Sequence, residues 1–511
     1  METFLTKHAD LITASLSCFD RIIFKGYLPL GYESAMDGWL SQRGILLKDF
    51  GRFVKRQADR LQQHARAVAE QTGRPLRYLG GRQNKEKLVD QILKDHPIQA
   101  GLIAVLSAVE AGSSFRLASG EGRPRLERAP RKCLCYYFYY QDPVFGRMHI
   151  RLQTWFPFTI QVYLNGHDWL ARAMAAEGLD FLQEDNCFTH LGNPERAQQL
   201  ADQFPRLAWP RILSEMASRV NPLLKDLLKG MEYYWVADQA ELSTDVLFKD
   251  SASLRPLYGE LLRQATLSFG AEDVMHFLGR KMTPQFKGEI RTSATRREPG
   301  SRIKHRMKQN WIKMYNKAGL VLRIETVINH PYEFRVRRKG KRKGEEIMGW
   351  FPLTKGVKHL WRYRDVMRSA NARYLEALAA IENPAEAHKQ LERVCEPVRH
   401  KSRRQRGINP LRKDDWTLLK AVMRGEHCIH GLRNRDLAQA LSLPTPKDPK
   451  AARRQSGRLT RKLRLLHAHG LIAKIPRSRR WRVTAKGAAV MGAAIHYRER
   501  ALPEEIMRLA A

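Results

Sequence analysis

The sequence predicts an α+β protein: an antiparallel-sheet core with flanking helices, followed by a separate basic domain at the C-terminus. Two observations favour this class. Aromatic and β-branched runs at 133–140, 148–154 and 158–165 are separated by turns, which is typical of an antiparallel meander. Amphipathic stretches of helical length lie on both sides of these runs. The chain has 511 residues and 43% hydrophobic content, enough for about three domains.

Residues 1–125 are expected to form a mixed α/β region. Its predicted elements are a strand at 19–28 and helices at 33–43, 49–72 and 98–111. Gly, Ser, Pro and Arg dominate 112–131, and this composition is typical of an exposed loop.

Residues 126–340 are expected to form the α+β core around the meander. Further helices are predicted at 168–178, 193–204, 208–219, 253–268 and 272–278. The stretch 284–302 is polar, basic and interrupted by prolines, so it predicts a mobile loop. A β-hairpin follows, with strands at 311–317 and 320–326 around a turn at Ala318-Gly319.

The hairpin carries the most reactive group of side chains in the sequence. One strand offers Lys313, Tyr315 and Lys317 at alternate positions, and the other offers Arg323 and Glu325 in the same way. If the two faces coincide, the tyrosine can attack a phosphodiester as nucleophile, with the basic residues on the phosphate. The carboxylate would hold a divalent metal, Mg²⁺ or Mn²⁺.

The same segments, Met314-Tyr315-Asn316-Lys317 and Leu322-Arg323-Ile324-Glu325, resemble the "Y-x-K … R-x-E" end of the rolling-circle replication initiators of phages and plasmids. Those proteins nick a DNA strand with a tyrosine and a divalent metal. The resemblance implies that Tyr315 is the nucleophile and Glu325 a metal ligand or structural carboxylate. Asn316 stands where some such initiators have an acid, and their motif of two histidines around one apolar residue is absent.

Other acids offer a different way to hold metal. Asp20, Glu110, Glu241 and Asp245 are candidates, and Glu241 and Asp245 have helical i, i+4 spacing. A two-metal nuclease of the RNase H kind uses three or four such carboxylates. The alternative for each acid is an ordinary solvated or capping role. Tyr315 can likewise be a packed strand residue, with Arg323 and Glu325 as a cross-strand ion pair.

A basic loop and a helical bridge are expected at 341–395, with the helical pattern at 356–393. The run 335–343 is almost wholly basic and is predicted to be a flexible loop that binds phosphate. Its nucleic-acid-binding candidates are Arg337, Arg338, Lys341 and Arg342. A second basic stretch makes 396–412 a linker.

Residues 413–495 carry the pattern of three helices and a hairpin. The first helix is predicted to begin at Trp416, and the second and third to cover 432–441 and 451–469. Strands are predicted at 471–475 and 481–484. The third helix has Leu459, Leu463 and Leu466 on one side and cations on the other. Its cations, with those of the hairpin tip, are the predicted nucleic-acid contacts: Arg453, Arg454, Arg458, Arg461, Lys462, Arg464, Arg477, Arg479 and Arg480.

This segment resembles the MarR-type winged helices, including Thr484 and Gly487 in the "T-x-x-G" pattern with which those proteins leave the wing. The resemblance implies a winged helix-turn-helix domain. Its third helix would enter the major groove of double-stranded DNA. Its arginine-rich wing suits the minor groove or the phosphates beside it.

The charge of the chain points to a polyanionic partner. Lys and Arg number 90 against 52 Asp and Glu, a formal net charge of +38. Residues 401–511 hold half of that excess, with 27 Lys and Arg against 8 Asp and Glu. Such a field favours polyanions such as nucleic acids over neutral or basic partners. Few cysteines, no signal-peptide pattern and no apolar run of membrane-spanning length predict a cytoplasmic, nucleoid-associated protein without a membrane partner.

Three functions remain open from the sequence. The preferred one is a nucleic-acid-binding protein of mobile-element type, which docks on DNA through the C-terminal domain and nicks a strand at the core. The second is a MarR-like transcription regulator without enzymatic activity. The third is an RNA-binding component of a ribonucleoprotein, because bases stack on aromatic strands such as 136–140. RNA or single-stranded DNA at the core is compatible with the first and third, and the oligomeric state is not specified.

Overall fold

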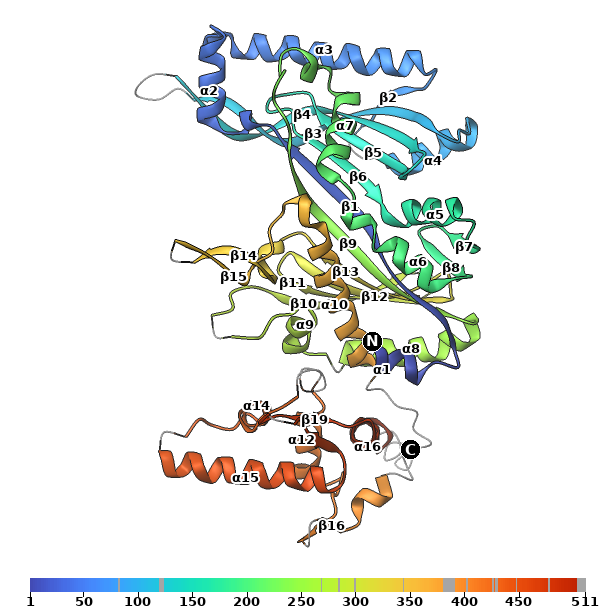
Figure 1. Ribbon diagram of the computed structural model, residues 1–511, viewed down its shortest axis with the longest axis vertical. Coiled ribbons are helices and arrows are strands. Elements are labelled where there is room, and N and C mark those ends of the chain that lie inside the picture. Colours follow the sequence, from blue (N-terminus) through green and yellow to red (C-terminus); the bar gives the residue numbers. More distant parts are fainter. Residues whose placement is uncertain are drawn as a thin grey trace, which may run out of the picture. The chain divides into compact units, whose positions relative to one another are not determined.

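The computed structural model confirms an α+β protein that combines helices with a large, mainly antiparallel sheet (Figure 1). The structure describes residues 1–80, 83–118, 124–267, 269–283, 285–297, 300–342, 344–379, 391–400, 403–424, 427, 431–446, 448–476 and 478–502. The chain divides into two compact units. Unit 1 comprises Met1–Thr13, Phe248–Ile324 and Ser369–Ala511, and unit 2 comprises Ala14–Leu247 and Glu325–Arg368.

Among the described residues, eleven strands form one sheet in the order β10-β11-β12-β13-β9-β1-β6-β5-β4-β3-β2. Their bounds are β1 Ile12–Tyr27, β2 Leu76–Tyr78, β3 Gly101–Ala118, β4 Arg125–Asp142, β5 Gly146–Gln153, β6 Ile160–Asn165, β9 Tyr234–Phe248, β10 Ile290–Arg297, β11 Gly300–Met307, β12 Asn310–Lys317 and β13 Val321–Ile328. The long strands β1 and β9 run side by side (Figure 1).

The strand order contains a repeated pattern that no sequence repeat indicates. After β1 the chain forms helices and then the meander β3 to β6, whose last strand pairs with β1. After β9 it again forms helices and then the meander β10 to β13, whose last strand lies beside β9. The first strands of both patterns, β1 and β9, are neighbours in the sheet.

Four two-stranded ribbons and the helices complete the described elements. The ribbons are β7 Phe181–Glu184 with β8 Cys187–Leu191, β14 Arg335–Arg342 with β15 Glu345–Pro352, β16 Val398–His400 with β17 Arg403–Gln405, and β18 Ile472–Lys474 with β19 Trp481–Val483. The helices are α1 Glu2–Lys7, α2 Glu33–Gln42, α3 Phe50–Gln71, α4 Lys85–Asp95, α5 Gly166–Ala176, α6 Pro194–Ala201, α7 Trp209–Val220, α8 Ser251–Leu267, α9 Ala271–Phe277, α10 Leu360–Leu378, α12 Lys413–Val422, α14 Asn434–Ala440, α15 Pro449–Ala468 and α16 Ala485–His496.

Most sequence-predicted elements are confirmed. Helices α2, α3, α5 to α9 and α10 lie where amphipathic periodicity predicts them, and β4, β5 and β6 form the predicted meander. The hairpin turn is also confirmed. Ala318 and Gly319 both have positive φ, 53° and 76°, as tight turns between antiparallel strands require.

The predicted helix at 98–111 and the predicted loop at 112–131 are wrong. Most of both segments belongs to β3 and β4, which pair from Gly101↔Gln141 to Ala118↔Arg125, and residues 119–123 lie outside the described residues. Residues 102–108 are all buried, and a continuous apolar run of this kind has no periodicity that separates a buried strand from a buried helix. Beyond it, most side chains of β3 are exposed or half-buried. The backbone partners of this part come from β4, a pairing that local composition does not reveal.

Two predicted loops are also strands. The stretch 284–302 contains β10 and the start of β11, which pair from Ile290↔Met307 onward. The basic run 335–343 contains β14, whose partner β15 supplies the backbone hydrogen bonds. In both cases the second strand of the hairpin stabilises a polar segment that looks irregular when taken alone.

In unit 2, helices α2 and α3 pack on the turn between β5 and β6. Phe156 lies against Trp39 of α2 and Phe53 of α3, with ring centroids 5.7 and 6.0 Å apart. All three side chains are buried, and burial of each contributes roughly 1.5–3 kcal/mol. This aromatic cluster ties the helices to the meander that carries β6, the neighbour of β1.

The C-terminal helices have a hydrophobic core of their own. Leu419 of α12, Leu437 of α14 and Leu463 of α15 are buried together with Leu471 and Val490. The apolar side of α15 thus lies inward, as its spacing predicts, and its cationic side is left facing solvent.

His305 makes unit 1 sensitive to acid. Its imidazole is fully buried between the Thr292 hydroxyl at 2.8 Å and the Tyr374 hydroxyl at 2.9 Å, and burial lowers its pKa to about 4. An unfolded histidine takes up a proton near pH 6.5, so the folded form is favoured above that pH. The contribution of His305 to the free energy of unfolding falls by about 1.4 kcal/mol per pH unit as the pH falls from 6.5 toward 4.

We therefore expect the melting temperature to fall over this window, and His305→Gln to make the fall shallower. Scanning calorimetry at several pH values measures both. The exposed His96→Gln is the control and should leave the slope unchanged. Equal slopes for wild type and His305→Gln would contradict the assignment.

Candidate metal centre

Three carboxylates from three neighbouring strands lie together in unit 2. Asp20 is on β1, Glu241 on β9 and Glu325 on β13, and these strands are adjacent in the sheet. One oxygen of each lies within 4.8 Å of those of the other two, and the residues are 7%, 4% and 1% exposed. We call these three residues the acidic cluster. Carboxylate oxygens gathered at this spacing are the ligand type that Mg²⁺ and Mn²⁺ prefer.

Neighbouring side chains orient two of the carboxylates. Asn186 donates through Nδ2 to Asp20 Oδ1 at 2.6 Å, and Gln239 donates through Nε2 to Glu241 Oε1 at 2.6 Å. Arg21 Nη1 lies 3.9 Å from the same Glu241 oxygen. Burial alone lowers the pKa of Arg21, but nearby anionic groups, Glu241 first, raise it by more. The net rise reflects the negative potential around the acidic cluster.

A buried histidine lies beside the cluster. The Nδ1 atom of His167 is 3.5 Å from Asp20 Oδ1, and its Nε2 atom is 3.6 Å from Asp245 Oδ2 and 3.4 Å from the Ser243 hydroxyl. Asp245 is predicted to be a metal ligand together with Glu241. In the structure it lies beside His167 and is not one of the three acids of the cluster. The predicted helical spacing of Glu241 and Asp245 is wrong, because both lie on β9.

Helix α5 begins at the point where it brings His167 to Asp20. Asn165 ends β6 opposite Arg21 of β1, and its side chain accepts a hydrogen bond from the His167 backbone N–H at 2.8 Å. Gly166 passes so close to β1 that a Cβ atom would lie 2.2 Å from the Phe19 carbonyl oxygen. The absence of a side chain at 166 therefore allows this approach.

Glu110, another predicted acid, has a different environment. It accepts hydrogen bonds from Lys85 at 2.8 Å, Tyr137 at 2.7 Å and Arg151 at 3.0 Å. Burial raises its pKa, but these donors and charges lower it by more, so the net shift is downward. Glu110 is the centre of a half-buried polar network between α4, β3, β4 and β5.

The hairpin residues predicted to converge are divided between the units. Glu325 joins the acidic cluster in unit 2, whereas Lys313, Tyr315, Lys317 and Arg323 belong to unit 1. Tyr315 is 7% exposed and Arg323 is fully buried. Lys313 lies opposite Lys304 in the β11–β12 register. The nucleophilic role of Tyr315 stays a prediction.

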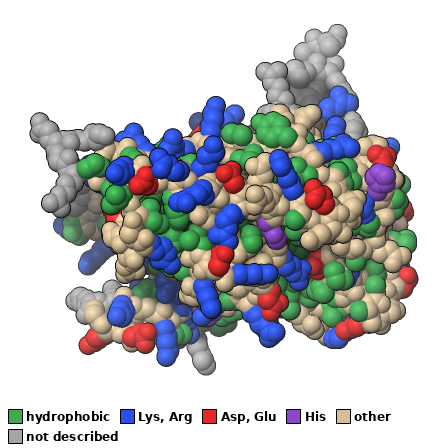
Figure 2. Space-filling view, turned by 90° about the horizontal axis from the view of Figure 1, so that it is seen from above, with side chains coloured by type: hydrophobic (Ala, Val, Ile, Leu, Met, Phe, Trp, Pro, Cys, Tyr) green, Lys and Arg blue, Asp and Glu red, His purple; other side chains and the backbone are tan. Residues whose placement is uncertain are grey.

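The predicted nucleic-acid contacts of α15 form an exposed cationic face. Arg453, Arg454, Arg458, Arg461 and Arg464 are exposed, and Lys462 is half-buried. Positive side chains are also frequent elsewhere, and one face of the molecule shows Lys and Arg interspersed with fewer acids (Figure 2).

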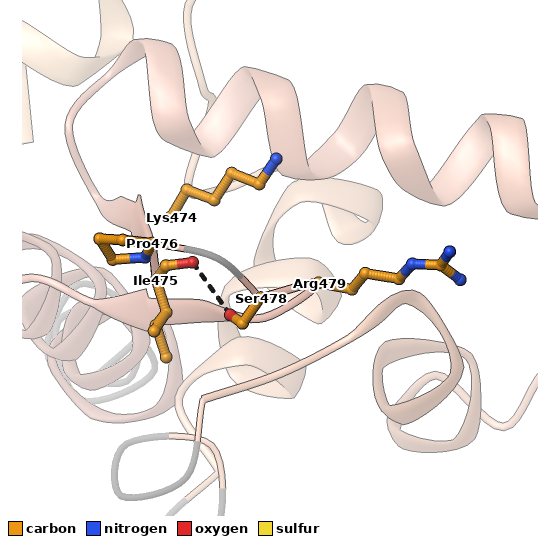
Figure 3. A pocket seen from close by; sticks show the side chains of 5 residues that line it. All are labelled: Lys474, Ile475, Pro476, Ser478 and Arg479. Atoms are coloured by element: carbon orange, nitrogen blue, oxygen red, sulfur yellow. Dashed lines mark hydrogen bonds between the residues drawn. The ribbon is translucent and has the colours of Figure 1, made fainter.

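The β18–β19 tip forms a shallow hollow of about 450 Å³ (Figure 3). The Ser478 hydroxyl donates to the Ile475 carbonyl oxygen at 2.9 Å and so closes the turn. Lys474 and Arg479 extend their charged ends away from this turn (Figure 3). Arg480 is half-buried, and Arg477 lies outside the described residues.

All three members of the acidic cluster could be named as candidate ligands from the sequence, but their grouping could not. His167, Asn186 and Gln239 were missed as neighbours of the cluster. The pair Gln239 and Glu241, two residues apart on one strand, is the only local signal, since such residues share a face.

Comparison of the chain with family models, curated proteins and solved structures gave no match. Among the described residues, none of the helices combines the length and the apolar content needed to cross a lipid bilayer.

Gly166→Ala should disturb the acidic cluster through the backbone. The new methyl group must push α5 away from β1, an overpacking effect that costs about 1–3 kcal/mol, and should weaken Mn²⁺ binding as His167 moves. Thermal denaturation and calorimetric Mn²⁺ titration measure the two effects.

Gly38→Ala in α2 is the matched control, because nothing lies within 4 Å of its Cβ position. Alanine there should stabilise the helix by roughly 0.5–1 kcal/mol and leave Mn²⁺ binding unchanged. A Gly166→Ala protein as stable as wild type would rule out the close approach.

Proposed function

We propose that the protein is a metal-dependent enzyme that cleaves phosphodiester bonds in nucleic acid. Asp20, Glu241 and Glu325 would hold Mg²⁺ or Mn²⁺, and the C-terminal domain would dock on DNA. The observation that carries this proposal is the convergence of three buried carboxylates inside a chain of net charge +38.

The electrostatics of the cluster support a cation. Carboxylates within 4.8 Å of one another repel when they carry charge, and burial weakens the screening that water provides. A divalent ion bound to their oxygens removes this repulsion. When bound, it would supply charge stabilisation on a phosphate and a water of lowered pKa.

The residues around the cluster have positioning roles in this scheme. Asn186 would hold one oxygen of Asp20 by a hydrogen bond, and Gln239 would hold one oxygen of Glu241 in the same way. These hydrogen bonds restrict the rotation of each carboxylate and so orient it toward a metal ion. The Nδ1 atom of His167 lies 3.5 Å from Asp20 Oδ1, the same oxygen that Asn186 contacts. In hydrolysis, the water oxygen forms a bond to phosphorus, the bond to the leaving sugar oxygen breaks, and that oxygen takes up a proton.

The basic surface supports nucleic acid as the substrate. A phosphodiester polyanion is attracted to the excess of 38 positive charges, whereas a neutral substrate gains nothing from it. Because the acids of the cluster are buried and the cations of α15 are exposed, the cluster can bind metal while the surface binds phosphate.

For the C-terminal domain we propose a winged helix-turn-helix with α15 as the recognition helix. Helices α12, α14 and α15 and the β18–β19 ribbon follow one another in the order of that fold. The Thr484 hydroxyl accepts from the Gly487 N–H at 2.9 Å and caps α16. A Cβ at Gly487 would lie 1.8 Å from the Leu471 carbonyl oxygen, which explains the glycine at the end of the "T-x-x-G" pattern.

The resemblance of the hairpin sequence to rolling-circle initiators offers Tyr315 as an alternative nucleophile. In that route the phenolic oxygen loses its proton and bonds to phosphorus, the bond from phosphorus to the leaving sugar oxygen breaks, and that oxygen takes up a proton. The strand end stays attached to the protein, as in the rolling-circle initiators that the hairpin sequence resembles. A regulator without activity, or an RNA-binding protein, would need neither the cluster nor Tyr315. Metal titration and an assay for a covalent adduct separate these outcomes.

Replacement of one ligand should abolish metal binding and cleavage. We expect Glu325→Gln to remove the stabilisation by Mn²⁺ in thermal denaturation and to reduce metal-dependent cleavage of labelled DNA and RNA at least about 100-fold. The melting temperature of the variant in chelator gives the baseline against which the effect of Mn²⁺ is measured.

Glu110→Gln is the control for the loss of a half-buried acid, and Mn²⁺ should stabilise this variant as it does wild type.

Tyr315→Phe tests the tyrosine route and should retain hydrolysis. If wild type forms a covalent adduct on denaturing gels and this variant does not, the tyrosine route is established instead. If wild type and Glu325→Gln respond identically to Mn²⁺, the metal proposal fails.

Removal of α15 charges should weaken duplex binding. Each phosphate that the protein no longer neutralises reduces the slope of log affinity against log salt by about 0.9, so Arg458→Ala with Arg461→Ala should lower it by about 1.8. Fluorescence anisotropy with a labelled duplex at several salt concentrations measures the slope. Arg211→Ala with Lys87→Ala, exposed cations on α7 and α4, is the control pair. An unchanged slope in the α15 variant would exclude this helix from the interface.

A further inference from the structure

The β14–β15 ribbon in unit 2 has one face that is exposed over three successive residue pairs. The register places Arg337 opposite Trp350, Lys339 opposite Met348 and Lys341 opposite Glu346. Directly opposed residues of an antiparallel pair point to the same side, and all six are exposed. We call these six residues the outer face of the ribbon.

Two large apolar side chains lie among the cations of the outer face. Trp350 is 66% exposed and Met348 is 56% exposed, and they are two residues apart on one strand. Exposed tryptophan is uncommon at a surface without a partner, because its ring gains more than most side chains by leaving water. Here each apolar side chain has a cation directly across the ribbon.

The opposite face of the ribbon is packed near its base, whereas Ile347 farther along it is 37% exposed. Val336 is buried, and the Arg338 guanidinium lies 5.3 Å from the centre of the Phe351 ring. Gly340 leaves room for that ring, which would lie 2.9 Å from a Cβ atom at this position. Because Val336 is buried and Phe351 is partly covered, the register holds Trp350 and Met348 outward rather than letting the ribbon turn over.

Cations crowd the base of the ribbon as well. Burial lowers the pKa of His359, and the neighbouring charges of Arg362, Lys358 and Arg338 lower it further. Burial and Arg338 also lower the pKa of Arg362. A bound polyanion would reduce this repulsion between like charges.

We propose that the outer face binds single-stranded nucleic acid, with bases stacked on Trp350 and against Met348 and with phosphates on Arg337, Lys339 and Lys341. This inference deepens the proposed function by naming the strand state of the substrate. It rests on that function only for the link to cleavage, since binding at the ribbon needs no metal.

The chemistry of the outer face favours a single strand over a duplex. Alternate residues of a strand are about 6.6 Å apart, so the cations form a row that an extended, flexible backbone can follow. Base stacking on an aromatic ring requires an unstacked base, and a single strand offers one where a duplex offers only edges and backbone. An acidic peptide would satisfy the cations but has no planar group for the Trp350 ring.

The test uses the full chain with Arg458→Ala and Arg461→Ala, in chelator, so that α15 binding and cleavage do not contribute. Fluorescence anisotropy follows a labelled oligothymidylate and a duplex of equal length. We expect Trp350→Ala to weaken single-strand binding by about 5- to 150-fold and duplex binding much less. Arg337→Ala with Lys339→Ala should reduce the single-strand salt slope by about 1.4.

Tyr78→Ala is the matched control, because this aromatic side chain is 64% exposed on β2 and should be neutral when truncated. Circular dichroism checks that the ribbon variants remain folded. The inference would be overturned if Trp350→Ala weakened duplex and single-strand binding equally. It would also be overturned if a poly-glutamate peptide displaced the oligonucleotide while Trp350→Ala left oligonucleotide affinity unchanged. Glu325→Gln should bind the oligonucleotide normally, so failure of the metal centre and failure of the ribbon are distinguishable.

Discussion

The burial of three carboxylates side by side is the constraint on which the rest of the structure depends. Two like charges 4.8 Å apart repel by roughly 3.5 kcal/mol at an effective dielectric constant of about 20, and the cluster contains three such pairs. Pairing between β1, β9 and β13 holds these groups together regardless of that repulsion. The hydrogen bonds from Asn186 and Gln239 and the charge of Arg21 offset part of it.

The topology explains how one chain brings these acids together. Asp20 and Glu241 lie on the two long strands that begin the repeated meanders, and Glu325 lies on the strand that ends the second one. Because each meander returns its last strand to its first, the three acids meet in neighbouring strands although the chain between them is long. Helix α5 then brings His167 to the same place through the close contact at Gly166.

Charge is separated in space in this protein. The carboxylates of the cluster are buried, whereas the arginines of α15 and the cations of the β14–β15 ribbon are exposed. In the proposed function a polyanion would meet the positive surface, and a metal ion would meet the buried oxygens. The ribbon adds an element that charge alone does not provide, because Trp350 and Met348 offer apolar area to a base.

The sequence by itself determined the elements whose pattern is local. Amphipathic spacing predicted α2, α3 and α15, alternation predicted the meander, and Ala318-Gly319 predicted the hairpin turn, since these signals depend on near neighbours in the chain. Tertiary structure alone decided β3, β10 and β14, whose strand conformation depends on partners that composition does not identify. It also decided the acidic cluster. Asp20, Glu241 and Glu325 could be named as acids, but their meeting depends on strand order, and strand order comes from the packing of the whole sheet.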